Sequence, residues 1–117
     1  MPFPLADLLK AAGEPTRLRI LNLLRGGPIC VCELQAVLQI PQPTVSRHLA
    51  ALRHAGLVRD DRDGTRVVYS LAAPDTPRLQ AFHSLLITAC STEEELLPDL
   101  ARWKQLKRRR AQPTAAS

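Results

Sequence analysis

Two cysteines that flank a single valine, Cys30 and Cys32, are the residues best suited to chemistry, and a third cysteine is Cys90. Thiolates are soft ligands that select soft metal and metalloid ions. A thiol near a helix N-terminus is also favoured in its thiolate form by the helix dipole. In a reducing compartment an odd number of cysteines is expected to stay as thiols. The pair therefore suggests a site for a thiophilic ion, with core packing and redox chemistry as alternatives.

The composition limits what kind of protein this is. The 117 residues are enough for one compact domain. The net charge of +5 suggests a polyanionic partner, nucleic acid first, but by itself it is equally consistent with a solvated basic surface. Neither a signal peptide nor a membrane-length apolar run is present, so we expect a cytoplasmic protein without a membrane partner. No glycine-rich phosphate loop and no nucleophile paired with a base is found, so we do not expect an enzyme.

Hydrophobic periodicity and turn residues predict the elements that position the thiols. A capping box, Cys30 to Glu33, is expected to open the helix that carries the pair. After a polar turn at 60–64, a helix with Cys90 on its apolar stripe should follow, and then a last helix capped by Ser91. The predicted fold is mainly α-helical with a β-hairpin wing, a winged helix-turn-helix of order ααααββαα. We expect a domain at residues 1–107 and a basic, disordered tail at 108–117. The predicted helices begin at about residues 5, 15, 30, 43, 74 and 91, and the predicted strands are 57–58 and 65–71.

The helix at about 43–55 has the pattern of a DNA-recognition helix. Its apolar residues Val45, Leu49 and Leu52 share one face. Glutamine and arginine can make bidentate contacts with base edges, and serine and threonine can contact bases or phosphates. Arg62 and Arg66 flank the predicted wing tip, where they can meet DNA phosphates. The sequence therefore predicts double-stranded DNA as a partner. The predicted contacts on the helix are Gln42, Thr44, Ser46, Arg47, His48 and Arg53.

Two segments carry a resemblance to a known family. Residues 41–58, PQPTVSRHLAALRHAGLV, and residues 14–21, EPTRLRIL, resemble the ArsR/SmtB family of metal-responsive repressors. The resemblance implies a homodimer whose interface is formed by the first and fifth helices. It also implies operator binding that an inducer releases. One departure is Pro41, where the family commonly has a serine helix cap, and this departure concerns only the first turn of the recognition helix.

The segment from Cys30 to Leu34, CVCEL, resembles the arsenite-responsive branch of that family. The resemblance implies As(III) or Sb(III) as the inducer, held by Cys30 and Cys32, and no prosthetic group. A further cysteine that the branch can carry is replaced by Gln35. Cys90 is then either a third ligand or a residue of the core or dimer interface. No cysteine lies in residues 1–29, which argues against the Cd/Pb branch, and His83 has no acidic partner at zinc-site spacing.

Helix geometry suggests how an ion would act. Side chains two residues apart on a helix point about 200° apart. If the whole segment were helical, Cys30 and Cys32 could hold one ion only after the helix start unwinds, which would displace the recognition helix. Three alternatives stay open: a redox-sensing repressor released by a disulfide, a thiol redox enzyme, and a protein-interaction module that needs no metal.

Overall fold

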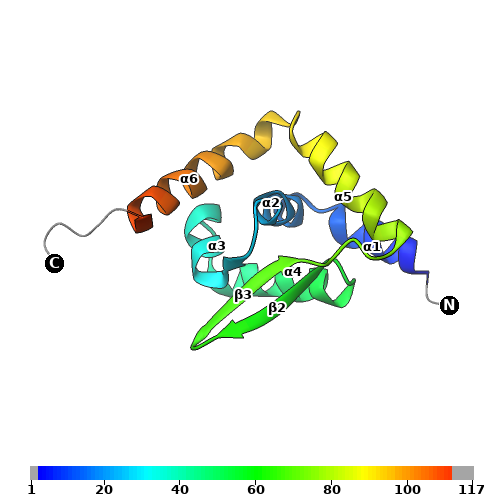
Figure 1. The fold of residues 1–117 in the computed structure, drawn as a ribbon, viewed down its shortest axis with the longest axis horizontal. Helices are drawn as coiled ribbons and strands as arrows, with labels where there is room; N and C mark the ends of the chain where they lie inside the picture. The colour runs from blue at the N-terminus through cyan, green and yellow to red at the C-terminus, as the bar shows by residue number, and fades with distance from the viewer. Residues whose placement is uncertain (1–2, 112–117) are drawn as a thin grey trace, which may run out of the picture.

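The structure is a computed structural model that describes residues 3–111. The element order confirms the predicted winged helix-turn-helix and adds two elements, the strand β1 and the 3-10 helix η1. The last helix extends beyond the boundary predicted at residue 107, and the remainder of the predicted tail, 112–117, lies outside the described residues. The elements, shown in Figure 1, are α1 (Pro4–Ala12), α2 (Pro15–Leu24), β1 (Ile29–Cys30), α3 (Val31–Leu38), α4 (Gln42–His54), β2 (Val58–Asp63), β3 (Arg66–Leu71), α5 (Pro77–Cys90), η1 (Glu94–Leu96) and α6 (Leu97–Ala111).

Side-chain caps and prolines set several helix starts. Helix α2 is capped by Glu14, whose carboxylate accepts a hydrogen bond from the Arg17 backbone N–H at 2.9 Å. Helix α5 is capped by Thr76, whose hydroxyl accepts from the Leu79 N–H at 3.2 Å. The prediction that Ser91 caps the last helix is wrong. Ser91 ends α5 instead, where its hydroxyl donates to the Thr88 carbonyl at 2.9 Å, and η1 lies between it and α6.

Aliphatic side chains from the helices and the hairpin form one core. Phe82, Leu86 and Cys90 are the buried residues of α5, which confirms the predicted stripe. Aromatic residues are scarce in the sequence, so close packing of branched aliphatic chains supplies most of the burial. None of the helices between residues 3 and 111 has both the length and the apolar character that a membrane span requires. The centre of the core is built by Ile20, Leu21, Leu34, Val45, Leu49, Leu52 and Leu57.

The sheet has three antiparallel strands in the order β1-β3-β2. Strand β1 pairs Cys30 with Val68, so the thiol segment is joined directly to the wing. The prediction of a polar turn at 60–64 is wrong for most of its length. Strand β2 continues to Asp63, paired with Arg66, and only Gly64 (φ +67°) and Thr65 turn the chain. Charged residues can occupy β2 because, apart from Val58, the strand is exposed.

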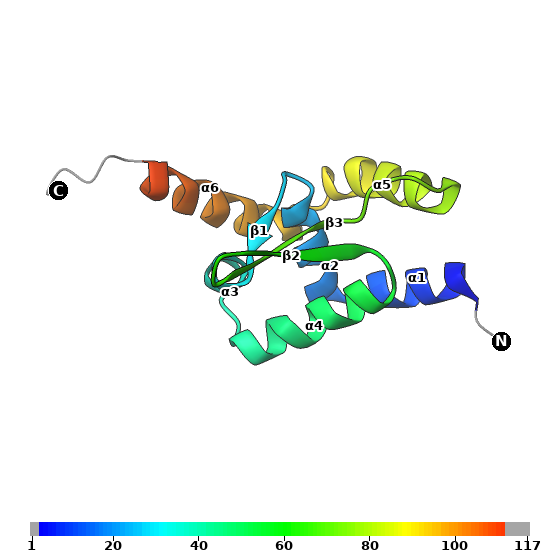
Figure 2. The ribbon, with the colours of Figure 1, turned by 60° about the horizontal axis from the view of Figure 1, so that its bottom comes forward.

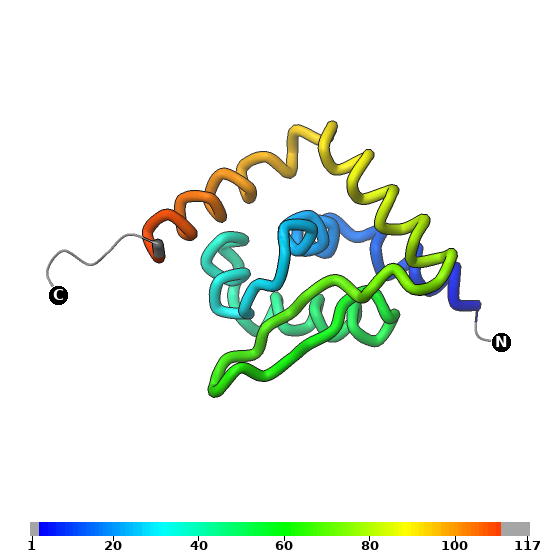
Figure 3. The backbone as a smooth tube through the Cα atoms, in the orientation of Figure 1, coloured from blue at the N-terminus to red at the C-terminus, as the bar shows by residue number. Residues whose placement is uncertain are grey.

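Helices α5 and α6 form an arch over α2 (Figure 3). Asp99 of α6, which is 1% exposed, connects α6 to α2. Its carboxylate accepts from Arg19 Nε of α2 at 2.8 Å and from Arg102 Nη2 at 2.6 Å. Arg102 Nε also donates to the Val37 carbonyl of α3 at 2.7 Å. Helix α4 lies on the side of the molecule away from the arch (Figure 2), so its outer face is not covered by α5 or α6.

Candidate nucleic-acid interface and thiol site

Helix α4 is held to the core by one face. Val45, Leu49 and Leu52 are fully buried, as predicted. The helix begins after Pro41, whose carbonyl accepts from the backbone N–H groups of Thr44 and Val45 at 3.0 and 3.1 Å. No side chain caps this start, which is the consequence of proline in place of serine. The first turn is therefore held by backbone hydrogen bonds and by the fixed φ of proline.

The opposite face of α4 is open to solvent. Four of the predicted contact residues, Gln42, Ser46, Arg47 and Arg53, are exposed there, and Thr44 is half-buried. The same face carries Pro43, Ala50 and His54, which the sequence reasoning did not select. Ala50 follows Ser46 by one helical turn and so lies on the same face. Its position could have been predicted from this spacing, although its side chain is not polar. A small residue at this position lets another molecule approach the helix backbone closely.

His48 is placed differently from the other predicted residues of α4. Its Nδ1 accepts a hydrogen bond from Arg17 Nε of α2 at 3.1 Å and lies 3.7 Å from the Glu14 carboxylate. The His48 side chain is 20% exposed. His48 therefore faces α2 and fixes how the recognition helix sits on the preceding helix. The structure does not bring it together with the outward residues of α4.

The two arginines predicted at the wing tip differ in their surroundings. Arg62 is exposed on β2, and we find no ion pair for it among the described residues. Arg66 begins β3 and reaches back toward α3, where its Nη2 donates to Glu33 Oε1 at 3.3 Å. Arg53 of α4 joins its helix to the wing through Asp60 Oδ2 at 3.1 Å. The recognition helix and the hairpin are thus fastened to each other, while Arg66 belongs to the thiol site.

The two cysteines of the pair lie next to each other at the start of α3. Cys30 is the N-cap residue, with φ −80° and ψ 156°, and pairs in β1, so it is extended rather than helical. Cys32 follows in the first turn of α3, close enough to Cys30 for each thiol to shift the pKa of the other. The premise that both residues are helical is therefore wrong. The prediction that the helix start must unwind to bring the thiols together falls with it.

The surroundings of the pair shift the pKa values of the two thiols in opposite directions. Burial of the Cys30 thiol opposes its ionisation, but hydrogen bonds from Cys32 and Arg66 outweigh this effect and lower the Cys30 pKa below 9.0. The same hydrogen bond to Cys30 raises the pKa of Cys32, with burial adding to the effect. Cys30 is buried and Cys32 is exposed. The buried thiol is thus the first to ionise, and the exposed thiol gives access from solvent.

Glu33 organises this site from the third position of α3. Its Oε1 accepts from the Cys30 backbone N–H at 3.2 Å, which confirms the predicted capping box. The same carboxylate forms ion pairs with Arg66 of the wing and Arg110 of α6. One buried carboxylate therefore connects three elements beside the thiols. The Trp103 ring and Lys107, in cation–π contact at 5.3 Å, line a cavity of about 520 Å³ with Cys30 and Glu33.

A second cavity, of about 330 Å³, joins the thiols to the candidate DNA-binding elements. Cys30 and Cys32 line it from the start of α3, Gln42 and Ser46 from α4, and Arg66 from β3. A ligand on the thiols would therefore contact both the recognition helix and the wing.

Cys90 lies apart from the pair. It lines an apolar cavity with Leu9, Leu18 and Leu86, between α1, α2 and α5, and burial raises its pKa. Within residues 3–111 we find no cluster of three or more His, Cys, Asp or Glu side chains able to hold a metal ion. The structure therefore brings together Cys30 and Cys32 but not Cys90. His83, whose Nε2 lies 2.8 Å from the Ala72 carbonyl, is tied to the backbone.

Comparison with known proteins agrees with this geometry. Residues 14–60 match the family "Bacterial regulatory protein, arsR family". The arsenic resistance transcriptional regulator ArsR1 of Pseudomonas putida is 38% identical over 112 residues, which cover 94% of this chain and 85% of that protein.

Solved structures give the same result. The homodimeric winged helix-turn-helix DNA-binding domain Mb0332 of Mycobacterium bovis superposes with a TM-score of 0.66 at 31% identity, covering 75% of this chain and 79% of that one. Reduced HlyU of Vibrio cholerae superposes with a TM-score of 0.62 at 35% identity, covering 71% and 84%.

The fold, the exposed face of α4 and the hairpin beside it define a winged helix-turn-helix protein of the DNA-binding type. The chain belongs to the ArsR family of bacterial regulatory proteins. This family consists of transcriptional regulators, and the resemblance found in residues 14–21 and 41–58 is confirmed.

Proposed function

We propose that the protein is an arsenic(III)-responsive transcriptional repressor, which binds operator DNA in the cytoplasm as a homodimer and leaves it when the inducer binds Cys30 and Cys32. The observation that carries this proposal is the cavity shared by the two thiols, Gln42 and Ser46 of α4, and Arg66 of the wing. Chemistry at the thiols takes place against both elements that would contact DNA.

In the DNA-bound state, α4 lies in the major groove. Gln42, Ser46 and Arg47 are its exposed polar residues nearest the N-terminal end, where recognition helices reach base edges. Thr44 and Arg53 contribute at the edges of the same surface. Arg62, exposed on β2, contacts the phosphate backbone. Arg66 acts between the wing and the thiol site, since its guanidinium is held by Glu33.

The dimer is supported by apolar side chains that the single chain leaves in solvent. Leu5 and Leu9 of α1 are 48% and 54% exposed, and Leu85 and Ile87 of α5 are 53% and 61% exposed. Large exposed apolar side chains gathered on two helices mark an interaction surface. Mb0332, which has the same fold, is homodimeric. We therefore assign the dimer interface to α1 and α5.

The donor atoms of the thiol site fit As(III) or Sb(III). Both ions are thiophilic, and the two cysteines line the same cavity. In arsenious acid, two thiols replace two hydroxyl groups, their protons leave with the hydroxyls as two waters, and arsenic keeps its oxidation state. Cys30 and Cys32 supply the protein ligands in this proposal. Cys90 serves packing, in keeping with its place among apolar residues.

Inducer and DNA must oppose each other to the same extent. If the inducer weakens DNA binding by a given factor, DNA weakens inducer binding by that factor. Arg66 provides the route, because it donates to Glu33 and its positive charge also lowers the pKa of the Cys30 thiol. When Cys30 becomes a ligand, its sulfur can no longer ionise beside Arg66, and this interaction is lost. The position of the wing strand then changes relative to α4.

The test is a fluorescence anisotropy titration on a duplex that the wild-type protein selects from a random pool. Arsenite is expected to release DNA from wild type and from Cys90→Ser, and not from Cys30→Ser or Cys32→Ser. Direct binding is followed by the fluorescence of Trp103, the single tryptophan of the chain, which lines a cavity with Cys30. Release that persists in the Cys30→Ser, Cys32→Ser double variant would refute the thiol site.

A redox-sensing repressor is the second candidate. The contact between the Cys30 and Cys32 thiols favours it, and a related structure is described as reduced HlyU. Peroxide would oxidise the two thiols to one disulfide and itself be reduced to two waters. Titrating the same complex with peroxide in place of arsenite separates the two candidates. Release by peroxide alone would replace the metalloid proposal with the redox one.

A further inference from the structure

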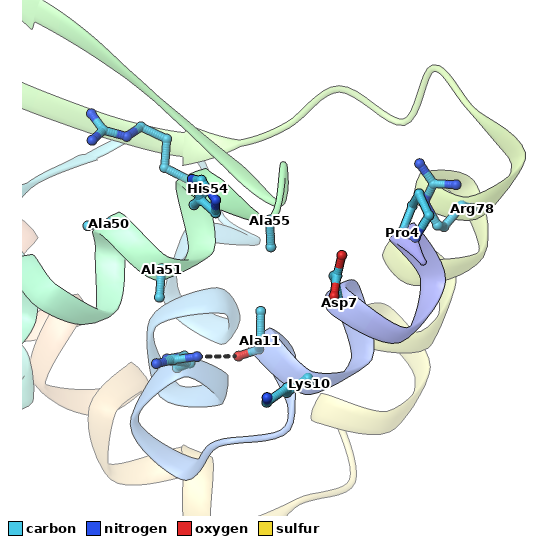
Figure 4. Close-up of a pocket in the computed structure, with 11 residues that line it drawn as sticks. Pro4, Asp7, Lys10, Ala11, Ala50, Ala51, His54, Ala55 and Arg78 are labelled. Carbon is cyan, nitrogen blue, oxygen red and sulfur yellow. Dashed lines mark hydrogen bonds between the residues drawn. The ribbon is translucent and has the colours of Figure 1, made fainter. Parts of the chain in front are cut away.

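A basic groove lies beside the C-terminal half of α4, between α1 and the start of α5 (Figure 4). Its volume is about 1090 Å³, and it is open to solvent. One wall is lined by small residues, Ala50 and Ala51 of α4 and its C-cap residue Ala55. Among the lining residues the only carboxylate is Asp7. The basic residues around the groove are Lys10, Arg17, Arg53, His54 and Arg78.

Two of these residues, Lys10 and Arg78, carry a positive charge that is available to a polyanion. Arg53 is paired with Asp60, and Arg17 is engaged with His48 and the Ala11 carbonyl, the latter bond drawn in Figure 4. Lys10 and Arg78 are exposed, and neither forms an ion pair in the part of the chain that the structure describes. They can therefore approach a phosphate without leaving a carboxylate unpaired.

We propose that this groove binds the phosphate backbone of DNA, with Lys10 and Arg78 as the phosphate contacts. The inference rests on the proposed function, because it takes α4 as the helix that enters the major groove. Ala50 and His54 belong both to the outward face of α4 and to the groove. When α4 enters the major groove, the DNA phosphate backbone beside it therefore lies at this groove of the protein. The alanine wall allows this close approach.

The position of the groove predicts which phosphates it contacts. Lys10 lies on α1 and Arg78 on the first turn of α5, and these are the helices that carry the exposed apolar residues assigned to the dimer interface. In a dimer built on α1 and α5, the two grooves lie on the inner side of each half-site. The contacts therefore fall toward the centre of the operator, where the wings and the N-terminal ends of α4 do not reach.

The test measures the affinity for the selected duplex as a function of salt concentration. Each phosphate contact contributes about 0.9 to the slope of log affinity against log salt. A single Lys10→Gln or Arg78→Gln substitution removes two contacts from a dimer and should lower the slope by about 1.8. Asp7→Asn removes the repulsive carboxylate from the same groove and should strengthen binding. Lys104→Gln, an exposed cation on α6 across the molecule from α4, is the matched control.

Two failures can be told apart. If the wild-type protein selects no duplex, the proposed function is wrong. If the wild-type protein binds DNA, but the salt slopes of Lys10→Gln and Arg78→Gln equal that of the control Lys104→Gln, the groove does not bind DNA. Hydroxyl-radical footprinting should show protection at the operator centre that is lost in the two groove variants and kept in the control. Sedimentation tests whether the two groove variants still form the dimer. If they dimerise more weakly than wild type and keep its salt slope, the inference is also overturned.

Discussion

Replacing Asp99 by asparagine should destabilise the protein through the joint between α6 and α2. Asp99 is 1% exposed and accepts three charge-assisted hydrogen bonds, from Arg19 Nε and Nη2 and from Arg102 Nη2, at 2.8, 2.9 and 2.6 Å. Removing one partner of a buried ion pair costs about 3–5 kcal/mol. The Arg19 and Arg102 side chains are 28% and 34% exposed, so water partly resolvates them. We therefore expect a loss of about 3 kcal/mol, at the lower end of this range.

Urea unfolding followed by the fluorescence of Trp103 measures this loss, since Trp103 is buried on the same helix as Asp99. Wild type and variant are compared at one protomer concentration, because the stability of a dimer depends on concentration. Asp75→Asn, an exposed carboxylate in a loop, is the control and should change stability by less than about 0.5 kcal/mol. A loss below about 1 kcal/mol for Asp99→Asn would refute the assignment of α6 docking to this carboxylate.

Three further predictions concern the core, the third cysteine and pH. Leu49→Ala should cost about 2–5 kcal/mol in urea unfolding, because the side chain is 0% exposed and leaves a cavity on the inner face of α4. Cys90→Ser should cost about 1–3 kcal/mol by burying a hydroxyl among apolar residues, yet leave release by arsenite intact. At Glu14, burial acts to raise the pKa, but hydrogen bonds from the Arg17 and Thr16 backbone lower it from 4.5. Its carboxylate therefore stabilises the fold above that value and loses this effect as pH falls. Glu14→Gln should flatten the decline of unfolding free energy between about pH 5 and about pH 3, and an unchanged decline would contradict this.

Local patterns in the sequence were enough to predict α4 and the start of α3. Val45, Leu49 and Leu52 mark the buried face of α4 by their spacing alone, and the outward face follows from it. The spacing of Cys30 and Glu33 identified a capping box, because that hydrogen bond is local. Both features depend on residues within three or four positions of each other, where helix periodicity applies.

Long-range pairing accounts for what the sequence could not predict. Strand β1 is two residues long and exists only because Ile29 and Cys30 pair with β3, about 40 positions away. That pairing keeps Cys30 out of the helix and so decides the thiol geometry. Arg66 was expected at the wing tip, but Glu33 is its partner across 33 positions of sequence. Neither contact leaves a periodic signal.

The network around α3 limits how the helix can move. Its C-terminal carbonyls, at Val37 and Leu38, accept from Arg102 and Arg19 at 2.7 and 3.0 Å, and its N-terminal Glu33 is paired with Arg110. Helix α3 is therefore held in place at both of its ends. Sliding it along its axis would break charge-assisted hydrogen bonds at each end. If the proposed function holds, we therefore expect a signal from the thiols to act through Arg66 and the wing rather than through a shift of α3 along its own axis.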